Sequence, residues 1–429
     1  MGEESVTSSG PAAKKPGFWS FLGPGLITGA ADDDPSGIAT YAQVGAKFGY
    51  DLGWTMLLCY PLMSAVQEIS GRLGRVSGRG IAGNIRKHYS PTFVTIMVGL
   101  LLVANIINIG ADIGAMADAV HLLIAGPTSL YVVLFGVTCA ALEVFMKYDR
   151  YAAVLKWLCI SLFAYVATVL VVQVPWGEAA YHLVVPEFRF DADLIVSIVA
   201  VLGTTISPYL FFWQSSEEAE VERQKGEKPL KREPDKAKPE LHRIRLDTYV
   251  GMGFSNIISL CIIYTAAATL HAHGVTDIQS SAQAAEALRP IAGPFAFFVF
   301  AAGIIGTGLL AVPVLAGSAA YAVGEAMRWP TGLGRLPHQA KAFYGVVTVA
   351  TLVGMGLNFT PIDPIKALFW AAVVNGVVSV PVLAVMMRLA TRRDVMGQFV
   401  LPPILAGMGW LTTAVMAFTV VAMLLTWGH

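Results

Sequence analysis

The sequence predicts an all-α polytopic membrane protein. Of its 429 residues, 55% are hydrophobic and only 14% are charged, and the mean hydropathy is +0.62. This composition is typical of a chain that crosses a bilayer many times and excludes an ordinary soluble enzyme. The 29 Lys and Arg residues balance the 29 Asp and Glu residues, so no net charge indicates a nucleic-acid partner. The expected surroundings are the lipid bilayer.

Eleven apolar stretches have the length and hydropathy of membrane spans, since a helix needs about 20 residues to cross the hydrocarbon. They cover residues 18–48, 53–71, 93–123, 129–146, 151–174, 192–221, 248–271, 293–326, 342–358, 364–388 and 402–427. The first stretch is clearly interrupted, and the sixth shows signs of a second interruption. Residues 1–17 are polar and are predicted to be a disordered cytoplasmic tail.

Basic residues alternate between the connections of these spans. The connections after spans two, four, six, eight and ten are rich in Lys and Arg, whereas the others are poor in both. Positively charged connections stay in the cytoplasm. We therefore expect an integral protein of the plasma (inner) membrane, with its N-terminus cytoplasmic and its C-terminus outside. The stretch 222–241 is charged and contains proline, which predicts a solvated cytoplasmic linker.

Three adjacent carboxylates, Asp32, Asp33 and Asp34, interrupt the first span, and Pro35 and Gly37 follow them. A charge in hydrocarbon is costly unless it faces water, a partner or an ion. Proline removes a backbone donor and disfavours helix at the residue before it. The segment is either a loop outside the membrane or a discontinuous helix that lines a polar cavity. The two flanks together are long enough for one span, which favours the discontinuous helix.

A second break is predicted in the sixth span, where Pro208 follows Thr204, Thr205 and Ser207. Pro208 frees a backbone carbonyl one turn earlier, near Thr204. Alone, this pattern indicates a structural kink. However, spans one and six begin two five-helix units, 18–174 and 192–388, with 402–427 left over. Because an odd helix number inverts the second unit, matching breaks in the two units point to a site near the middle of the membrane.

Several segments resemble the NRAMP family of divalent-metal transporters. They are Gly23-Pro24-Gly25, the Asp34-Pro35 break, residues 43–49, residues 71–79 and the proline break in span six. The resemblance implies a LeuT-like fold of two inverted five-helix repeats plus an eleventh helix, with helices 1 and 6 broken. It also implies alternating access, divalent metal ions as the substrate, no resident cofactor and no enzymatic activity. No phosphate-binding glycine loop is present to indicate an ATP-driven pump.

The sequence also departs from the family's two motifs. Where the family has Asp-Pro-Gly-Asn, the chain ends the motif with Gly37, so that the asparagine ligand is lost. Where the family has Ala-x-x-Met-Pro-His, the chain carries Ser207 and Tyr209 in place of methionine and histidine. On span three, Asp112 is followed by Ala115 instead of glutamate. These departures, and the absence of a basic pair on span nine, resemble the NRAMP-related magnesium transporters.

The resemblance implies a metal site in which Asp34 is the principal ligand. The backbone carbonyls of Ala31 and Thr204 would contribute, Ser207 would bind directly or through water, and Gly37 would leave room by having no side chain. Oxygen ligands suit Mg²⁺, which keeps several of its waters. We therefore expect a monomeric secondary transporter that carries Mg²⁺, and also Mn²⁺, into the cytoplasm without proton coupling.

Two other functions remain open at this point. One is a proton-coupled Mn²⁺ or Fe²⁺ symporter of the main NRAMP type, and the other is a Mg²⁺ channel. The roles of five further polar residues also stay open. Asp32 and Asp33 either attract cations or face water, Asp112 is a relay or a structural partner, Glu68 serves permeation or structure, and Asn375 faces the site or bonds another helix.

Overall fold

The structure is a computed structural model that describes residues 24–146, 160–186 and 191–426. The predicted tail at residues 1–17 lies outside this part. The helices are α1 (Pro24–Asp32), α2 (Pro35–Phe48), α3 (Gly53–Ser77), α4 (Ile81–His88), α5 (Pro91–Leu123), α6 (Thr128–Phe145), α8 (Phe163–Val171), α9 (Trp176–Val184), α10 (Ala192–Thr205), α11 (Pro208–Gln224), α12 (Ala237–Thr269), α13 (Ser281–Glu286), α14 (Arg289–Ala292), α15 (Ala296–Met327), α16 (Lys341–Leu357), α17 (Pro364–Ala390), α18 (Arg393–Met396) and α19 (Pro403–Thr426).

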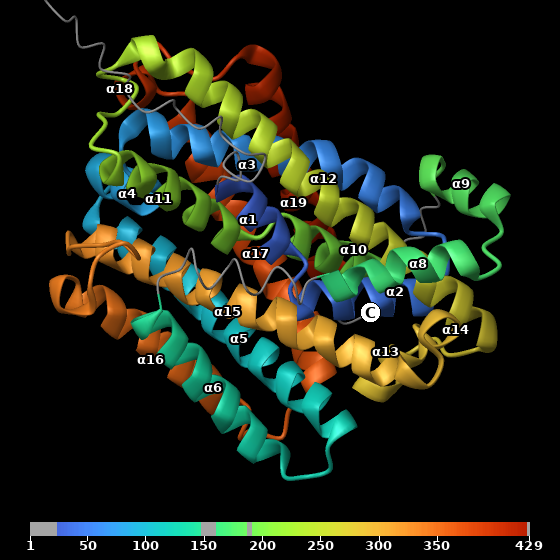
Figure 1. Ribbon diagram of the computed structural model, residues 1–429. Coiled ribbons are helices and arrows are strands. Elements are labelled where there is room, and N and C mark those ends of the chain that lie inside the picture. The colour runs from blue at the N-terminus through green and yellow to red at the C-terminus, as the bar shows by residue number, and fades with distance from the viewer. Residues whose placement is uncertain (1–23, 147–159, 187–190, 427–429) are drawn as a thin grey trace, which may run out of the picture.

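The all-helical architecture is confirmed (Figure 1). Within the described ranges, seven helices are long and apolar enough to cross a membrane, or eight if the bent pair of α8 and α9 counts as one span. Eleven were predicted. The remaining three correspond to the interrupted pair α1 and α2, to α3 with its charged residues, and to α16, which has 17 residues. Length and hydropathy alone therefore miss spans that are broken, polar or short.

Both predicted helix breaks are confirmed. Asp34 ends the first break and caps α2, because its side chain accepts a hydrogen bond from the Gly37 backbone N–H. Ile206 and Ser207 separate α10 from α11, and Pro208 occupies the first turn of α11. Proline fits this first turn, where its missing N–H costs nothing. Each proline thus restarts a helix after a short stretch of free backbone.

The two broken helices are held between long, unbroken ones. Figure 1 shows α1 near the middle of the bundle, and it packs against α12, while α10 packs against α17 and α15 against α5. Small residues let some of these helices approach closely. A Cβ built on Gly203 would lie 2.1 Å from the Ala372 carbonyl oxygen, and one on Gly45 would lie 2.2 Å from the Ile263 carbonyl oxygen.

The close approach at Gly203 yields a first prediction. Gly203→Ala forces α10 away from α17, and overpacking of this kind costs about 1–3 kcal/mol. We expect a lower thermal unfolding temperature in detergent and weaker transport, since α10 carries Thr204. Gly345→Ala in α16 is the matched control, because nothing lies within 4 Å of its added Cβ. Equal unfolding temperatures for the two variants would rule out this packing account.

The predicted linker at 222–241 needs correction at both ends. Helix α11 continues to Gln224, and α12 begins at Ala237. The remaining connection is also not fully solvated, because Leu230 is buried and its N–H donates to the Arg75 carbonyl oxygen at 3.2 Å. The charges in this region form ion pairs across helices, which is why the composition resembled a solvated segment.

Candidate ion site

Asp34 lies at the point where the two helix breaks meet, and its side chain is buried. Its Oδ1 accepts hydrogen bonds from the Ser36 hydroxyl and the Gly37 N–H, both at 2.7 Å. Its Oδ2 accepts a bond from the Asn108 amide of α5 at 2.9 Å. All three partners are uncharged hydrogen-bond donors. They hold the carboxylate in one orientation and leave it without a compensating positive charge.

The second break reaches the same centre through Tyr209. The Tyr209 hydroxyl donates to the Ala31 carbonyl oxygen at 2.9 Å and lies 3.4 Å from Asp34 Oδ2. The Ser207 hydroxyl lies 2.6 Å from the Gly203 carbonyl oxygen and 2.8 Å from the Thr204 carbonyl oxygen, and these two acceptors share its one proton. The structure therefore brings Asp34 and Ala31 together with the second break. Of the two carbonyls expected to bind metal, that of Ala31 accepts the Tyr209 hydroxyl, and that of Thr204 shares the Ser207 hydroxyl with Gly203.

Gly37 makes a close contact between the two breaks. A Cβ at this position would lie 3.1 Å from Thr204 Oγ1 and 3.2 Å from the Asp32 carbonyl oxygen. The absent side chain thus allows the two broken helices to touch. The free space that the sequence led us to expect at Gly37 is filled here by Thr204.

Asp32 and Asp33 are buried and point toward α12, which argues against the alternative that they merely face water. The Ser255 hydroxyl lies 2.5 Å from Asp32 Oδ2 and 3.1 Å from Asp33 Oδ1. The Ser259 hydroxyl lies 3.4 Å from the same Asp33 oxygen. A hydroxyl has one proton to donate. Ser255 can therefore satisfy only one of the two carboxylates at a time.

Two further polar side chains are buried on the helices around this centre. Neither oxygen of Asp112 on α5 forms a hydrogen bond of standard geometry with a described residue, although the Ser36 N–H faces this carboxylate. The side-chain oxygen and nitrogen of Asn375 on α17 have no partner among the described residues. The interhelical hydrogen bond considered for Asn375 is thus absent in this part of the chain. Buried polar groups without partners are costly and call for an explanation, such as an ion or water.

Asn108 is a site residue that the sequence reasoning missed. Its signal was a spacing: Asn105, Asn108 and Asp112 are separated by three and four residues in an otherwise apolar helix. This spacing places the three side chains on one face. Asn105 bonds the Leu315 carbonyl oxygen of α15 at 2.8 Å, whereas Asn108 bonds Asp34. One residue of this polar stripe therefore serves packing and the next serves the site.

The charge of this centre is its most informative property. Asp32, Asp33, Asp34 and Asp112 are all buried, and none of them forms an ion pair with a described Lys, Arg or His. Several uncompensated carboxylates in a low-dielectric interior require a bound cation or proton. Over the described ranges, no three side chains of His, Cys, Asp or Glu converge to hold a metal. A metal here would depend on Asp34, backbone carbonyls and its own waters.

Ion pairs connect several helices on the face of the molecule that carries α4. The buried Arg75 guanidinium of α3 pairs with Glu222 at 2.8 Å, with Glu240 at 3.3 Å and with Glu227. Arg243 of α12 pairs with the buried Glu218 at 2.5 Å. These contacts join α3, α11 and α12.

Glu68 belongs to the same face. Its carboxylate pairs with Arg72 one turn later at 2.5 Å, and its side chain is buried. This contact supports a structural role for Glu68, which was one of the two left open.

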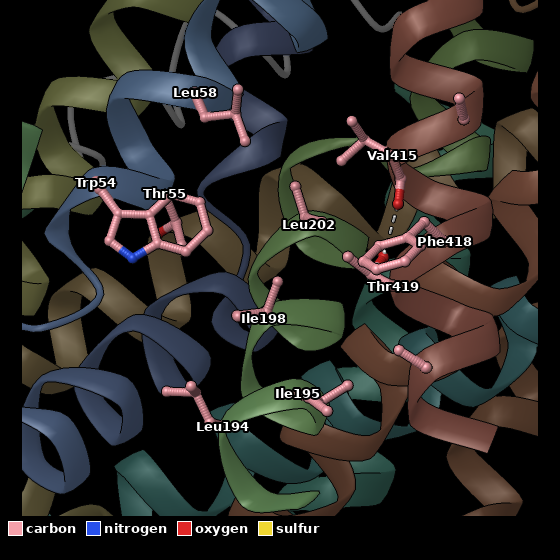
Figure 2. A pocket seen from close by; sticks show the side chains of 12 residues that line it. Trp54, Thr55, Leu58, Leu194, Ile195, Ile198, Leu202, Val415, Phe418 and Thr419 are labelled. Carbon is pink, nitrogen blue, oxygen red and sulfur yellow. Dashed lines mark hydrogen bonds between the residues drawn. The ribbon is translucent and has the colours of Figure 1, made fainter. Parts of the chain in front are cut away.

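A hollow lined mostly by apolar side chains lies away from the ion site. It has a volume of about 570 Å³ and lies between α3, α10 and α19. Figure 2 shows Trp54 and Leu58 on one side, Phe418 on the other, and Ile198 and Leu202 of α10 between them. Apolar side chains offer no ligands to a metal ion. The mostly apolar lining of this hollow therefore makes it an unsuitable metal site.

Together, the broken helices and the spans define a polytopic membrane protein with a cluster of buried carboxylates at its centre. The model of the family described as "Natural resistance-associated macrophage protein-like" matches residues 25–426. The chain belongs to this family, as the motifs of its first and sixth spans indicated.

Relatives and solved structures agree with this assignment. The divalent metal cation transporter MntH of Acidiphilium cryptum is 27% identical over 393 residues, which cover 88% of this chain and 83% of the relative. A manganese transporter of Eremococcus coleocola superposes with a TM-score of 0.74 at 16% identity, over 97% of this chain and 88% of that one. The transporter MhsT superposes with a TM-score of 0.60 at 13% identity, over 94% and 97%. The expected LeuT-like fold is thus confirmed.

Proposed function

We propose that this protein carries divalent metal ions into the cytoplasm by alternating access, with Mg²⁺ as its substrate and Mn²⁺ also accepted. The observation that supports this most strongly is the group of buried carboxylates around the two helix breaks, which has no basic partner among the described residues. The family membership and the names of the relatives support divalent metal transport in general.

In the proposed site, Asp34 supplies the anionic ligand, and the Ala31 and Thr204 carbonyls supply neutral oxygens. The hydroxyls of Tyr209 and Ser207 cover these carbonyls now, at 2.9 and 2.8 Å. When an ion enters, both hydroxyls rotate away from the carbonyl oxygens. Their oxygens then accept hydrogen bonds from the water molecules that the ion retains. A hydroxyl is donor and acceptor, so it can exchange one role for the other without leaving the site.

The preference for Mg²⁺ rests on the residue types. Mg²⁺ binds through one or two carboxylates and retains several waters, whereas thioether sulfur favours softer metals. Ser207 stands where the family's motif has methionine. A site of one carboxylate, carbonyls and hydroxyls fits a hydrated hard cation.

Transport without protons rests on Tyr209 and Ala115. They occupy the two positions where the resemblance places titratable groups, and tyrosine, with a reference pKa near 10, exchanges protons poorly at neutral pH. The membrane potential is a sufficient driving force: about 2.3 kcal/mol per charge per 100 mV gives about 4.6 kcal/mol for a divalent ion. This corresponds to a concentration ratio of roughly 2000.

A proton-coupled Mn²⁺ symporter is the second candidate, and the relatives named as divalent metal cation transporters are compatible with it. Asp32, Asp33 and Asp112 would then be the proton carriers, since all three are buried near Asp34. A Mg²⁺ channel is the third. Flux that saturates at modest ion concentration supports a carrier, whereas a high unitary conductance supports a channel.

We also propose how the chain is arranged in the membrane. Residues 18–174 and 192–388 form the two inverted repeats, and 402–427 forms helix 11. The N-terminus and the face with α4 lie in the cytoplasm, the C-terminus lies outside, and the protein acts as a monomer in the plasma membrane. The distribution of Lys and Arg supports this orientation.

Ser207→Met tests the metal preference. The change adds a soft ligand and fills space that water would occupy, so we expect the ratio of Mn²⁺ to Mg²⁺ transport to rise by about tenfold or more. Uptake of each ion into proteoliposomes measures the ratio. Thr205→Met is the control, since the Thr205 hydroxyl bonds its own helix at Val201. An unchanged ratio in an active Ser207→Met protein would remove Ser207 from the site.

A further inference from the structure

A basic pocket of about 320 Å³ lies on the face of the bundle that carries α4. Three helices and the turn before α4 form its walls. Its charged residues are Arg79, Arg86, Lys87, Arg223, Arg328 and one acid, Glu325. Five cationic side chains thus surround a hollow large enough for a small anion.

Most of these cations have no acidic partner among the residues that the structure describes. Arg86 donates to the Ala326 carbonyl oxygen at 2.5 Å. The other four basic side chains form no ion pair with any carboxylate in the described ranges. Glu325 does not neutralise them by direct pairing, because its oxygens accept bonds from the Gly80 and Gly83 N–H groups and from the Ser216 hydroxyl. The pocket therefore keeps an excess of positive charge.

The backbone at Arg328 gives a second, independent observation. Its φ is +62°, and it is the one non-glycine residue with positive φ in the described part of the chain. This left-handed conformation favours glycine at a helix end. Arg328 adopts it directly after α15, where its N–H bonds the carbonyl oxygen of Gly324 or Glu325. An arginine held in a strained position beside a basic pocket points to a use for its side chain.

The neighbouring His88 at the end of α4 is close enough to Lys87 and Arg79 to be affected by their charges. Partial burial lowers its pKa, and the nearby charges of Arg392, Lys87 and Arg79 lower it further, against the opposing effect of Asp394. Burial is the main cause of this shift, and the cations of the pocket add a smaller effect in the same direction.

We propose that this pocket binds a phosphate-bearing anion, either a free polyphosphate or the headgroup of an anionic phospholipid. The planar guanidinium group of Arg223 or Arg328 can donate two parallel hydrogen bonds to two oxygens of one phosphate. Lys87 adds a single positive charge. Basic pockets between membrane helices at the lipid surface suit such headgroups. The bound anion bridges α4, the end of α11 and the end of α15.

Such a bridge has a consequence for transport that does not depend on which metal is carried. Glu325 already joins α15 to α4 and to α11 through Gly80, Gly83 and Ser216. An anion across the same three elements holds this face closed, so that transport slows when the pocket is filled.

The test uses the full chain in detergent with EDTA, so that no divalent ion bridges the ligand to the protein. Pyrophosphate is titrated by calorimetry against the wild type, Arg328→Gly and Arg223→Gln. Retention of phosphatidylglycerol after extraction from mixed phosphatidylcholine vesicles is measured on the same proteins by native mass spectrometry. Arg232→Gln is the control, an exposed arginine outside the pocket.

We expect Arg328→Gly and Arg223→Gln to weaken binding by at least about tenfold, and Arg232→Gln to leave it unchanged. Arg328→Gly should also unfold at the same or a higher temperature, because glycine suits the left-handed position. Pyrophosphate binding identifies a free phosphate, and selective phosphatidylglycerol retention identifies a lipid headgroup. Failure of both ligands to bind, or an equal loss in Arg232→Gln, would overturn the proposal. Should Arg328→Gly not fold, Arg223→Gln decides the outcome.

Discussion

Asp34→Ala is expected to abolish transport of both Mg²⁺ and Mn²⁺ in proteoliposomes. The carboxylate is buried where the two helix breaks meet, and it receives bonds from Ser36, Gly37 and Asn108. It is the one anionic side chain that the proposed metal site has. Without this carboxylate, the ion would exchange part of its hydration shell for neutral oxygens alone. For a divalent cation, this exchange has a large unfavourable free energy.

Two controls separate the charge of Asp34 from its role as a helix cap. Asp34→Asn keeps a side chain that can cap α2 but removes the charge, so it should fold and remain inactive. Asp363→Ala removes a cap of the same kind at α17, where the exposed carboxylate accepts a bond from the Lys366 N–H. That variant should lose about 1 kcal/mol of stability and keep its transport. Wild-type flux through a folded Asp34→Asn protein would disprove the site.

Arg75→Gln is expected to destabilise the protein by about 3–5 kcal/mol, because removing one partner of a buried ion pair leaves the other charge unpaired. Arg75 is buried at the junction of α3, α11 and α12, and the side chain of its partner Glu222 is only 2% exposed. Thermal unfolding in detergent should show a lower transition temperature. Because these ion pairs join three elements on one face, transport should also change.

Arg289→Gln is the matched control for this prediction. Arg289 also pairs with a glutamate, Glu286 at 2.8 Å, but the two side chains are 68% and 36% exposed. Exposed pairs contribute only about 0–1 kcal/mol. Equal unfolding temperatures for Arg75→Gln and Arg289→Gln would mean that burial of the Arg75 ion pairs does not increase their contribution to stability.

The sequence predicted the two helix breaks well because both are local. Asp34 caps the helix that Pro35 begins, and Pro208 begins α11, so residues next to each other determine the geometry. The all-helical fold followed from composition for a similar reason. The meeting of the two breaks was predicted only through the symmetry of the two five-helix units.

The partners of the site residues could not be predicted from local patterns. Asn108 reaches Asp34 across 74 positions of sequence, and Ser255 reaches Asp32 across 223. The charged stretch at 222–241 was read as solvated for the same reason, since the guanidinium that pairs with Glu222 and Glu240 lies far away on α3. The tight contact of Gly37 with Thr204 also depends on tertiary packing.

Parallel ion and proton fluxes in proteoliposomes test the central claim most directly. Mg²⁺ and Mn²⁺ uptake are followed with the membrane potential clamped, while a trapped dye reports the internal pH. The account predicts saturable Mg²⁺ uptake, driven by a negative internal potential, without acidification above that of protein-free vesicles. Uptake of Mn²⁺ but not Mg²⁺, with acidification that scales with the ion taken up, would contradict it.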